Sequence, residues 1–401
     1  MIHVRALGGS GEYLRNCFLL EADGHCFLLD CGVKRILGRV DEVYPLVSRQ
    51  IASRLEAVFL SHAHEDHTAA LPYLLHLGYR GPVYGSPETI SLAPGFMRKW
   101  AMYVVQHGGS LPFDPSLIDI VPFHSLSFSS HLVSGVPLTV GRSGHMWGSY
   151  WYQFHFPSGT VLYTGDTASE GLLLAADPFP SSDVLIVDSA YASSHFSQKR
   201  QYQTVIELCE KTVAAGGSVL FPVPANGRGS DILIALGQAG FSLVVERTVF
   251  ERCRDLLQAR TWLRGSFTVP RCVVSDEATR DSVPLKGRLI LTPDGMLTSP
   301  IGLSYLARIR HDPISLVILT GYVAKGTMGY TLRETQEVRT SQVTIKVHPD
   351  SDDVARIVSS VHPKKVMLYH APLAESEALA LSLRQKGVEV TYGVNQTLSF
   401  P

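Results

Sequence analysis

The chain has 401 residues, of which 45% are hydrophobic and 18% charged, a composition typical of a soluble globular enzyme with two domains. Its 35 Lys and Arg against 36 Asp and Glu exclude the strong basic excess of a nonspecific duplex binder. A nucleic-acid substrate would therefore have to meet a local groove and metal ions. No apolar stretch approaches 18 residues, and the start lacks the apolar segment of a signal peptide, so we expect neither a membrane span nor a leader.

The six cysteines show no CxxC spacing. Four of them lie in apolar or helical stretches, which is typical of reduced, buried thiols. We therefore expect a cytoplasmic protein without a cysteine-based zinc site.

The first lobe begins with paired strands. Residues 16–21 and 25–30 flank an Ala-Asp-Gly turn, which predicts a hairpin. Residues 57–60 form a short apolar run that predicts a buried strand. A helix is expected after this strand, with Thr68 as its cap. Residues 88–106 predict another helix, interrupted at 93–95 by Ala-Pro-Gly.

Between that buried strand and its helix lies a cluster of three histidines and an aspartate within six residues. A strand-to-helix loop on a rigid scaffold can aim short side chains at one point. Imidazole and carboxylate groups are ligands that suit zinc or a similar first-row metal. The four side chains are those of His62, His64, Asp66 and His67.

Further candidates follow the predicted strands in the rest of the chain. From about residue 195 the pattern changes to short apolar strands alternating with helices, which predicts a small α/β domain with a mainly parallel sheet. The last seventy residues again alternate strands and helices, including a strand at 343–347. Taken singly, each candidate could be a structural histidine or a turn aspartate. Together they are expected to converge at one edge of a sheet: Asp30, His145, Asp166, Asp188, His348 and His370.

These residues resemble the metallo-β-lactamase fold, whose HxHxDH motif matches residues 62–67. The middle of the chain is similar to one subgroup, the β-CASP nucleases. Segments that resemble the subgroup's motifs are Asp188–Tyr191, Phe221–Arg228, Asp294–Leu297, Thr320–Gly329, His348–Asp350 and Tyr369–His370. The resemblance implies an α/β protein, an αββα sandwich (residues 1–194 and 337–401) with an inserted β-CASP α/β domain (195–336).

The chain departs from the subgroup in two places. The β-CASP pattern commonly has Ser-Ala before the histidine of its second motif, whereas Lys346 and Val347 precede His348 here. The inserted domain is also short for the subgroup.

The resemblance implies two Zn²⁺ ions, with Mn²⁺ as the alternative, and hydrolysis by a metal-bound hydroxide. His348 is then the candidate general acid for the leaving 3′-oxygen, oriented by Asp188, while Asp30 orients a ligand histidine. His62, His64 and His145 would hold one ion, Asp66, His67 and His370 the other, and Asp166 would bridge them.

Phosphate contacts are expected from the inserted domain. Arg228 precedes a predicted helix whose amides can meet an anion. Lys325, Gly326 and Thr327 offer a cation, a free amide and a hydroxyl, and Tyr322 can stack on an unpaired base.

The leading hypothesis is a dizinc nuclease that hydrolyses phosphodiester bonds of single-stranded RNA or DNA. The histidine at position 370 favours RNA by resemblance. Exonuclease and endonuclease action both stay open, as does assembly as a homodimer or in a larger processing complex. The alternatives are a DNA-directed β-CASP exonuclease, a hydrolase of a lactone or thioester, and a non-catalytic scaffold.

Overall fold

The computed structural model describes residues 1–401, which form two compact units. The first unit comprises residues 1–169, 176–195 and 348–401, and the second comprises residues 170–175 and 196–347. The segment 337–347, which we expected in the returning part of the sandwich, belongs to the second unit. Its strand β17 (Thr340–Gln342) pairs in parallel with β16 (Leu316–Leu319) of that unit's sheet.

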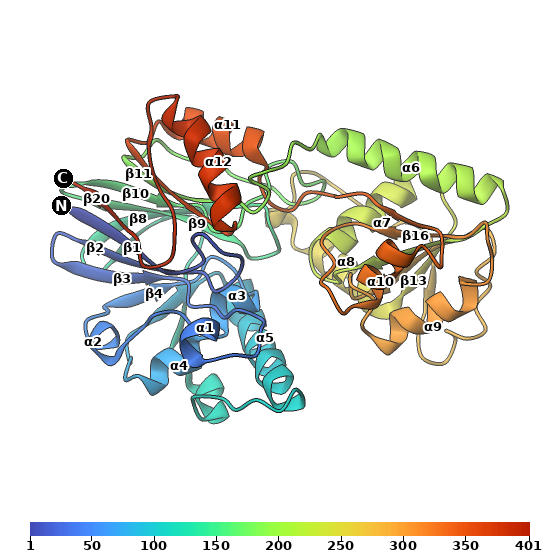
Figure 1. Cartoon of the computed structure of the whole chain (residues 1–401), viewed down its shortest axis with the longest axis horizontal. Coiled ribbons are helices and arrows are strands. Elements are labelled where there is room, and N and C mark those ends of the chain that lie inside the picture. Colours follow the sequence, from blue (N-terminus) through green and yellow to red (C-terminus); the bar gives the residue numbers. More distant parts are fainter. The chain divides into compact units, whose positions relative to one another are not determined.

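The first unit contains two seven-stranded sheets (Figure 1). One sheet has the order β20-β1-β2-β3-β4-β5-β6 and the other has the order β19-β18-β11-β10-β9-β8-β7. The strands of the first are β1 (Ile2–Gly8), β2 (Cys17–Ala22), β3 (His25–Leu29), β4 (Ala57–Phe59), β5 (Val83–Gly85), β6 (Phe123–Ser125) and β20 (Thr397–Phe400). Those of the second are β7 (Ser130–Val133), β8 (Val136–Arg142), β9 (Tyr150–Phe156), β10 (Gly159–Tyr163), β11 (Val184–Asp188), β18 (Lys365–Tyr369) and β19 (Glu389–Thr391).

An aromatic layer joins the two sheets. Phe59 of β4 packs against Tyr152 and Phe154 of β9, and Phe18 of β2 packs against Tyr163 and Tyr369. All of these rings are buried. Alternation along the strands leaves each outer face apolar as well, so each sheet needs a helical cover.

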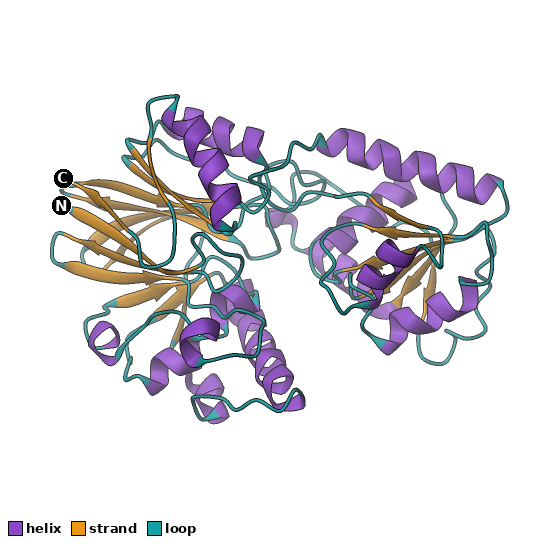
Figure 2. Ribbon diagram, in the orientation of Figure 1, coloured by secondary structure: helices purple, strands orange, loops and turns teal.

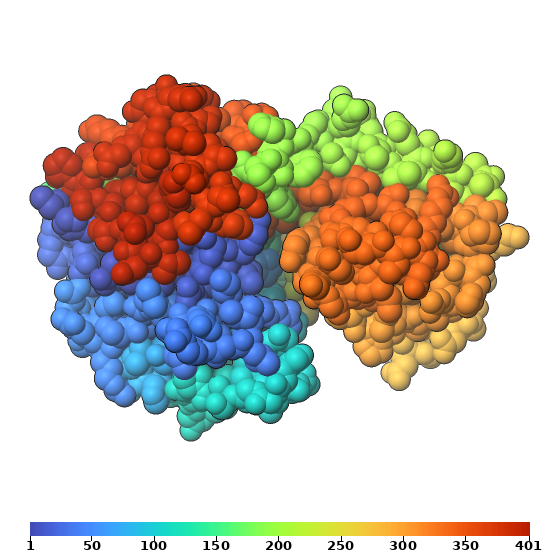
Figure 3. Space-filling view, in the orientation of Figure 1, coloured from blue at the N-terminus to red at the C-terminus, as the bar shows by residue number.

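Helices supply that cover and complete the αββα sandwich (Figure 2). The first sheet is covered by α1 (Val40–Val43), α2 (Arg49–Ala52), α3 (Glu65–Thr68), α4 (Leu71–His76), α5 (Pro87–Gln106) and η1 (Pro115–Ile120). The second is covered by α11 (Ser351–Val361) and α12 (Leu373–Arg384). The C-terminal segment, red in Figure 3, lies against the blue N-terminal segment, and β20 pairs with β1. The two ends of the chain therefore build one unit.

Two local expectations in the first unit were wrong. Helix α5 runs unbroken through Pro94, because it buries Met97, Trp100 and Val104 on one face and this packing offsets the lost hydrogen bond. The helix after β4 begins at Glu65, so Thr68 is not its cap and instead donates to the carbonyl oxygens of Ala63 and His64.

The second unit is a six-stranded parallel sheet of order β14-β13-β15-β12-β16-β17. Its further strands are β12 (Val219–Val223), β13 (Leu243–Glu246), β14 (Val273–Ser275) and β15 (Leu289–Pro293). Its helices are α6 (Gln198–Ala214), α7 (Arg228–Gln238), α8 (Arg247–Gln258), η2 (Arg260–Trp262), α9 (Pro300–Ile309) and α10 (Met328–Thr335). The predicted strand at 343–347 is not formed, since pairing ends at Gln342.

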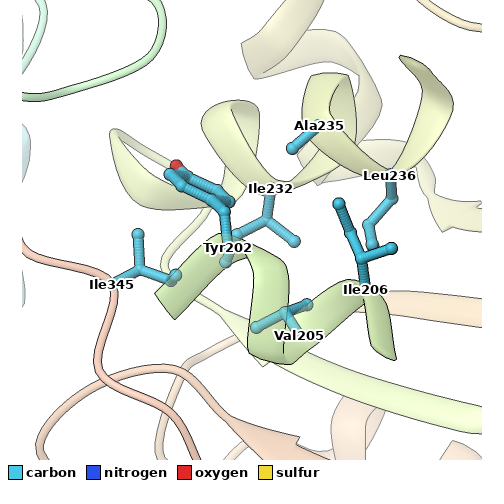
Figure 4. A pocket seen from close by; sticks show the side chains of 7 residues that line it. All are labelled: Tyr202, Val205, Ile206, Ile232, Ala235, Leu236 and Ile345. Carbon is cyan, nitrogen blue, oxygen red and sulfur yellow. The ribbon is translucent and has the colours of Figure 1, made fainter. Parts of the chain in front are cut away.

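A narrow seam lies between α6 and α7 of the second unit (Figure 4). Apart from Tyr202, its lining side chains are aliphatic: Val205, Ile206, Ile232, Ala235, Leu236 and Ile345. The seam is therefore a packing contact between the two helices, with few polar groups for binding or catalysis. No helix of the structure is both long and apolar enough to cross a membrane.

Candidate metal centre and substrate-binding segments

The metal-ligand candidates all lie in the first unit and follow the ends of its strands. The histidine cluster follows β4, His145 follows β8, Asp166 follows β10 and His370 follows β18. Two residues of the site have left-handed backbone conformations, with φ of 57° at Asp30, the residue expected to orient a ligand histidine, and 68° at the ligand candidate His370. Such strain at residues other than glycine persists only where the surrounding structure enforces it, and it is frequent at functional sites.

Three ring nitrogens form the first group. Nδ1 of His64 lies 3.0 Å from Nε2 of His62 and 3.3 Å from Nε2 of His145. His62 is fully buried, and His145 is 6% exposed. Sequence positions 62 and 145 are thus brought to one point by the joining of the two sheets.

The second group surrounds Asp66. Its Oδ2 lies 3.6 Å from Nε2 of His67 and 3.7 Å from Nε2 of His370. Asp66 and His67 reach this position because they occupy the first turn of α3.

Asp166 lies between the two groups. Its carboxylate oxygens are 3.3 Å from both His67 Nε2 and His370 Nδ1, 3.7 Å from His62 Nε2 and 3.9 Å from His145 Nε2. It is 1% exposed, so solvent does not satisfy its charge. The structure therefore places this side chain between the two groups, within 3.9 Å of nitrogens in both.

The electrostatics of the two groups differ. Burial lowers the pKa of His62 well below its ordinary value and that of His64 to about 4. Burial alone would also lower the pKa of His67 and His370. The surrounding carboxylates, Asp166 foremost, outweigh burial and raise the pKa of His370 to about 9 and that of His67 well above its usual range. His62 and His64 are thus held in the neutral form, which is the form that binds a metal.

The donor set fits divalent cations. His62, His64 and His145 can hold one ion, while His62, His67 and Asp166 also lie within reach of a common point. Nδ1 of His64 lies 3.0 Å and 3.3 Å from the nitrogens of His62 and His145, so the three ring nitrogens are close enough to share one ion. In addition, His370 Nδ1 is buried without a hydrogen bond of good geometry. Imidazole with carboxylate is a zinc-type ligand set.

Asp30 lies behind these groups and is fully buried. Its Oδ2 is 2.6 Å from Nδ1 of His67 and accepts hydrogen bonds from the hydroxyls of Tyr163 (2.5 Å) and Ser61 (2.6 Å). The contact with Nδ1 leaves Nε2 of His67 facing the two groups. The expected contact between Asp30 and a ligand histidine is therefore present.

His348 lies at the exposed side of the centre. Its Nδ1 is 2.9 Å from Oδ2 of Asp188 and 3.8 Å from Oδ2 of Asp166. Asp188 is fully buried and also accepts from the backbone N–H groups of Thr167 and Ala190, so its carboxylate is held rigidly. The His348 side chain is 14% exposed, which leaves its ring accessible.

The predicted phosphate-binding residues lie in the second unit, where three loops meet at the carboxyl edge of its parallel sheet. The loop after β12 carries Arg228, whose guanidinium fills the space beside Gly321 in the loop after β16. The backbone N–H of Gly329 donates to the carbonyl of Met296, in the loop after β15. Ligands of open α/β sheets bind at this edge.

The side chains at that edge are mostly accessible. Tyr322 is 69% exposed, and Lys325 and Gly326 are exposed as well. Gly326 has a φ of 89°, which a side chain would strain. Thr327 caps α10 through a hydrogen bond from the N–H of Tyr330, so its hydroxyl has a structural role too.

One residue that contacts the centre was missed by sequence reasoning. Asn16 is fully buried, and its Nδ2 lies 2.8 Å from Nε2 of His67. A single asparagine before a strand carries no signal in the sequence, because its partners are about fifty positions away.

Comparison with known proteins agrees with this fold and site. The metallo-beta-lactamase superfamily matches residues 10–215, a little over half of the chain. The chain belongs to this superfamily. Within it, the chain resembles the β-CASP group of nucleases, as the motifs predicted.

Two relatives and one solved structure illustrate the match. The transcription termination factor FttA of Methanothermobacter thermautotrophicus is 25% identical over 94% of this chain and 68% of its own length. The probable RNase MJ4 of Methanocaldococcus jannaschii is 25% identical over 93% of this chain and 94% of its own. A crystal structure of a protein of unknown function from Enterococcus faecalis shares the fold, with a TM-score of 0.63, 13% identity and 99% of both chains covered. Against other FttA sequences the chain spans less than two thirds of the relative, 58% and 57%.

Proposed function

We propose that the protein is a metal-dependent nuclease that hydrolyses phosphodiester bonds of single-stranded nucleic acid, with RNA preferred over DNA. The observation that carries this proposal is the position of Asp166, within 3.9 Å of four histidines that belong to two groups. The names of the relatives, a probable RNase and a transcription termination factor, support an RNA substrate.

The ions proposed are two Zn²⁺, with Mn²⁺ as the alternative. His62, His64 and His145 would hold one ion, Asp66, His67 and His370 the other, and Asp166 both. When bound, they would supply Lewis acidity to activate water and to offset charge on the phosphoryl oxygens.

The chain's own residues complete the reaction. His348 would give a proton to the leaving 3′-oxygen, a role supported by its accessible ring and by the contact of its Nδ1 with Asp188. Asp30 holds His67 in one orientation through Nδ1. In both histidines a carboxylate occupies Nδ1, so only Nε2 is left to act on the ion or the substrate. Because the rings are held in place, less reorganisation is needed during the reaction.

Charge is divided between the two units in a way that favours this substrate. The second unit has 19 Lys and Arg against 14 Asp and Glu, whereas the first has 16 against 22. We therefore assign the phosphate contacts to the second unit, through Arg228, Lys325, Gly326 and Thr327, with Tyr322 available to stack on a base.

Two further proposals concern the compartment in which the protein acts and the state in which it assembles. All six cysteines are unpaired, which supports action in the cytoplasm. A homodimer or a larger processing complex stays a proposal, and light scattering of the purified protein measures it.

The experiment that tests the function uses single-stranded RNA and DNA, each labelled at the 5′ or the 3′ end. Wild type loaded with zinc should cleave RNA faster than DNA, and Asp66→Ala should cleave neither. The product ladder separates exonuclease from endonuclease action and gives the polarity. Failure of the zinc-loaded wild type to cleave either polymer, with turnover of a lactone or thioester instead, would overturn the proposal.

A further inference from the structure

We infer that Lys99 and Arg35 bind backbone phosphates of the single-stranded substrate on the first unit, beside the metal centre. This inference rests on the proposed function, which supplies the nucleic acid. It adds a phosphate-binding site to the one assigned to the second unit, and neither residue belongs to the motifs that predicted the family.

Helix α5 carries a row of side chains that starts at the metal centre. The ring of Phe96 lies roughly perpendicular to the ring of His64, with their centroids 5.5 Å apart. Lys99 and Tyr103 come three and seven residues after Phe96, so the three side chains share one face of the helix. Helix α5 lies beside α3, whose first turn directly follows His64 (Figure 1). The row therefore leads from His64 along the surface of α5.

A cation lies over each of the two rings in this row. Nζ of Lys99 is 5.2 Å from the centroid of Phe96, and Cζ of Arg35 is 4.8 Å from the centroid of Tyr103. Both distances are within the range of a cation–π interaction. The two rings are two helical turns apart, which is roughly 10 Å along the axis, so the cations would meet different phosphates. Because the rings already hold these long side chains, less entropy is lost when an anion binds.

Both cations are accessible to an anion. Lys99 is exposed and forms no ion pair. The Arg35 side chain is 53% exposed, and its acidic contact is Glu65, which lies 3.4 Å from Nε. A guanidinium that stacks on a ring still offers its other N–H groups in its own plane. Arg35 can therefore contact a phosphate while it keeps Glu65 as a partner.

The cations next to them in the chain are neutralised. Lys34 pairs with Glu12 at 2.9 Å, and Arg98 pairs with Asp119. The first unit as a whole has 16 Lys and Arg against 22 Asp and Glu. An acidic surface repels a polyanion, so two accessible cations beside the metal centre would direct the strand to that place.

The test measures binding of a fluorescently labelled single-stranded RNA by anisotropy, with a chelator present so that no cleavage occurs. Lys99→Gln should weaken binding several-fold and lower the slope of log affinity against log salt by about 0.7. Arg35→Gln should do the same, and the double variant should lower the slope by about 1.4. With zinc bound, Lys99→Gln should raise KM for this RNA by a similar factor and leave kcat and zinc content unchanged. Lys99→Arg keeps the cation and should bind as wild type does.

A matched control separates this site from a general loss of charge. Arg98→Gln removes one positive charge at the adjacent position of the same helix and should leave the affinity and the salt slope unchanged. If Lys99→Gln matched Arg98→Gln in both quantities, the inference would be overturned.

Single strands in which one phosphate at a time is an uncharged methylphosphonate locate the contact. At one position the modification should weaken binding to wild type but not to Lys99→Gln. If Lys99→Gln cost the same affinity for every modified strand, the lysine would act only through its general field, which would also overturn the inference. A wild type that neither binds nor cleaves single strands would overturn the proposed function itself.

Discussion

Nδ1 of His348 lies 2.9 Å from Oδ2 of Asp188, and this carboxylate is fully buried. The two residues are 160 positions apart in the chain. Asp188 ends the buried strand β11, while His348 precedes α11 in the segment that returns to the first unit. An accessible imidazole fixed by a buried carboxylate is an arrangement suited to general acid catalysis.

His348→Ala should therefore slow cleavage of labelled RNA by about 10²–10⁴-fold, because the leaving oxygen loses its proton donor. Zinc content should stay at the wild-type value, since the proposed ligand groups are left in place. A substrate whose leaving group needs no proton, such as a nitrophenyl phosphodiester, should be cleaved at nearly the wild-type rate. Equal losses on both substrates would argue against the proposed role.

Asp166→Ala should remove both ions, because this carboxylate lies within 3.9 Å of nitrogens in both groups. His145→Ala should remove only one ion, since its ring packs against those of His62 and His64, the other two ligands proposed for that ion. Elemental analysis after dialysis gives the number of ions per chain. One ion retained by Asp166→Ala would exclude a bridging role.

Tyr163→Phe should destabilise the first unit by about 1–3 kcal/mol, because it leaves the buried Asp30 carboxylate with one hydrogen bond fewer. Urea unfolding measures this change in the free energy of unfolding when it is followed by the far-ultraviolet circular dichroism of the backbone. Tyr152→Phe removes another buried hydroxyl, one that donates to the carbonyl of Leu60, and should cost less because that acceptor is uncharged.

Lys325→Ala should raise KM for RNA several-fold and lower the slope of log affinity against log salt by about one, with zinc content unchanged. Lys386→Ala removes an exposed lysine of the first unit and serves as the control. A salt slope that falls equally in both variants would place the phosphate contacts outside the loop after β16.

The buried carboxyl of Asp231 should make the stability of the second unit depend on pH. Burial raises the pKa of this carboxyl to about 6, and its Oδ2 accepts from the N–H of Leu172 in the segment 170–175. Because the folded pKa exceeds the unfolded one, its contribution to stability is fully present below the unfolded pKa and is lost as pH rises through about 6. Hydrogen exchange at α7 should therefore quicken from pH 5 to 7.

Asp231→Asn provides the comparison for that prediction. The asparagine keeps an acceptor for Leu172 and does not ionise, so the extra opening of α7 between pH 5 and 7 should disappear once intrinsic exchange rates are corrected. Persistence of the pH effect in this variant would assign it to another group.

Some features of this protein follow from the sequence by itself. The spacing of His62, His64, Asp66 and His67 predicted a metal site, because imidazole and carboxylate groups are metal ligands, and its resemblance to the HxHxDH motif implied the superfamily that the comparison then showed. The alternation of short apolar strands with helices after residue 195 predicted the parallel sheet, because strands covered on both faces must be apolar throughout. These patterns are local in the sequence, so they can be recognised without the tertiary structure.

The tertiary structure decided the rest, because it depends on contacts between distant residues. Pairing of β11 with both β10 and β18 is what brings Asp166, Asp188 and His370 to one edge. The unbroken α5 and the early start of α3 depend on burial against the first sheet, which outweighs the local signals of Pro94 and Thr68. Asn16 acquires its partners only when β2 lies beside the loop of Asp66, so no motif could have found it.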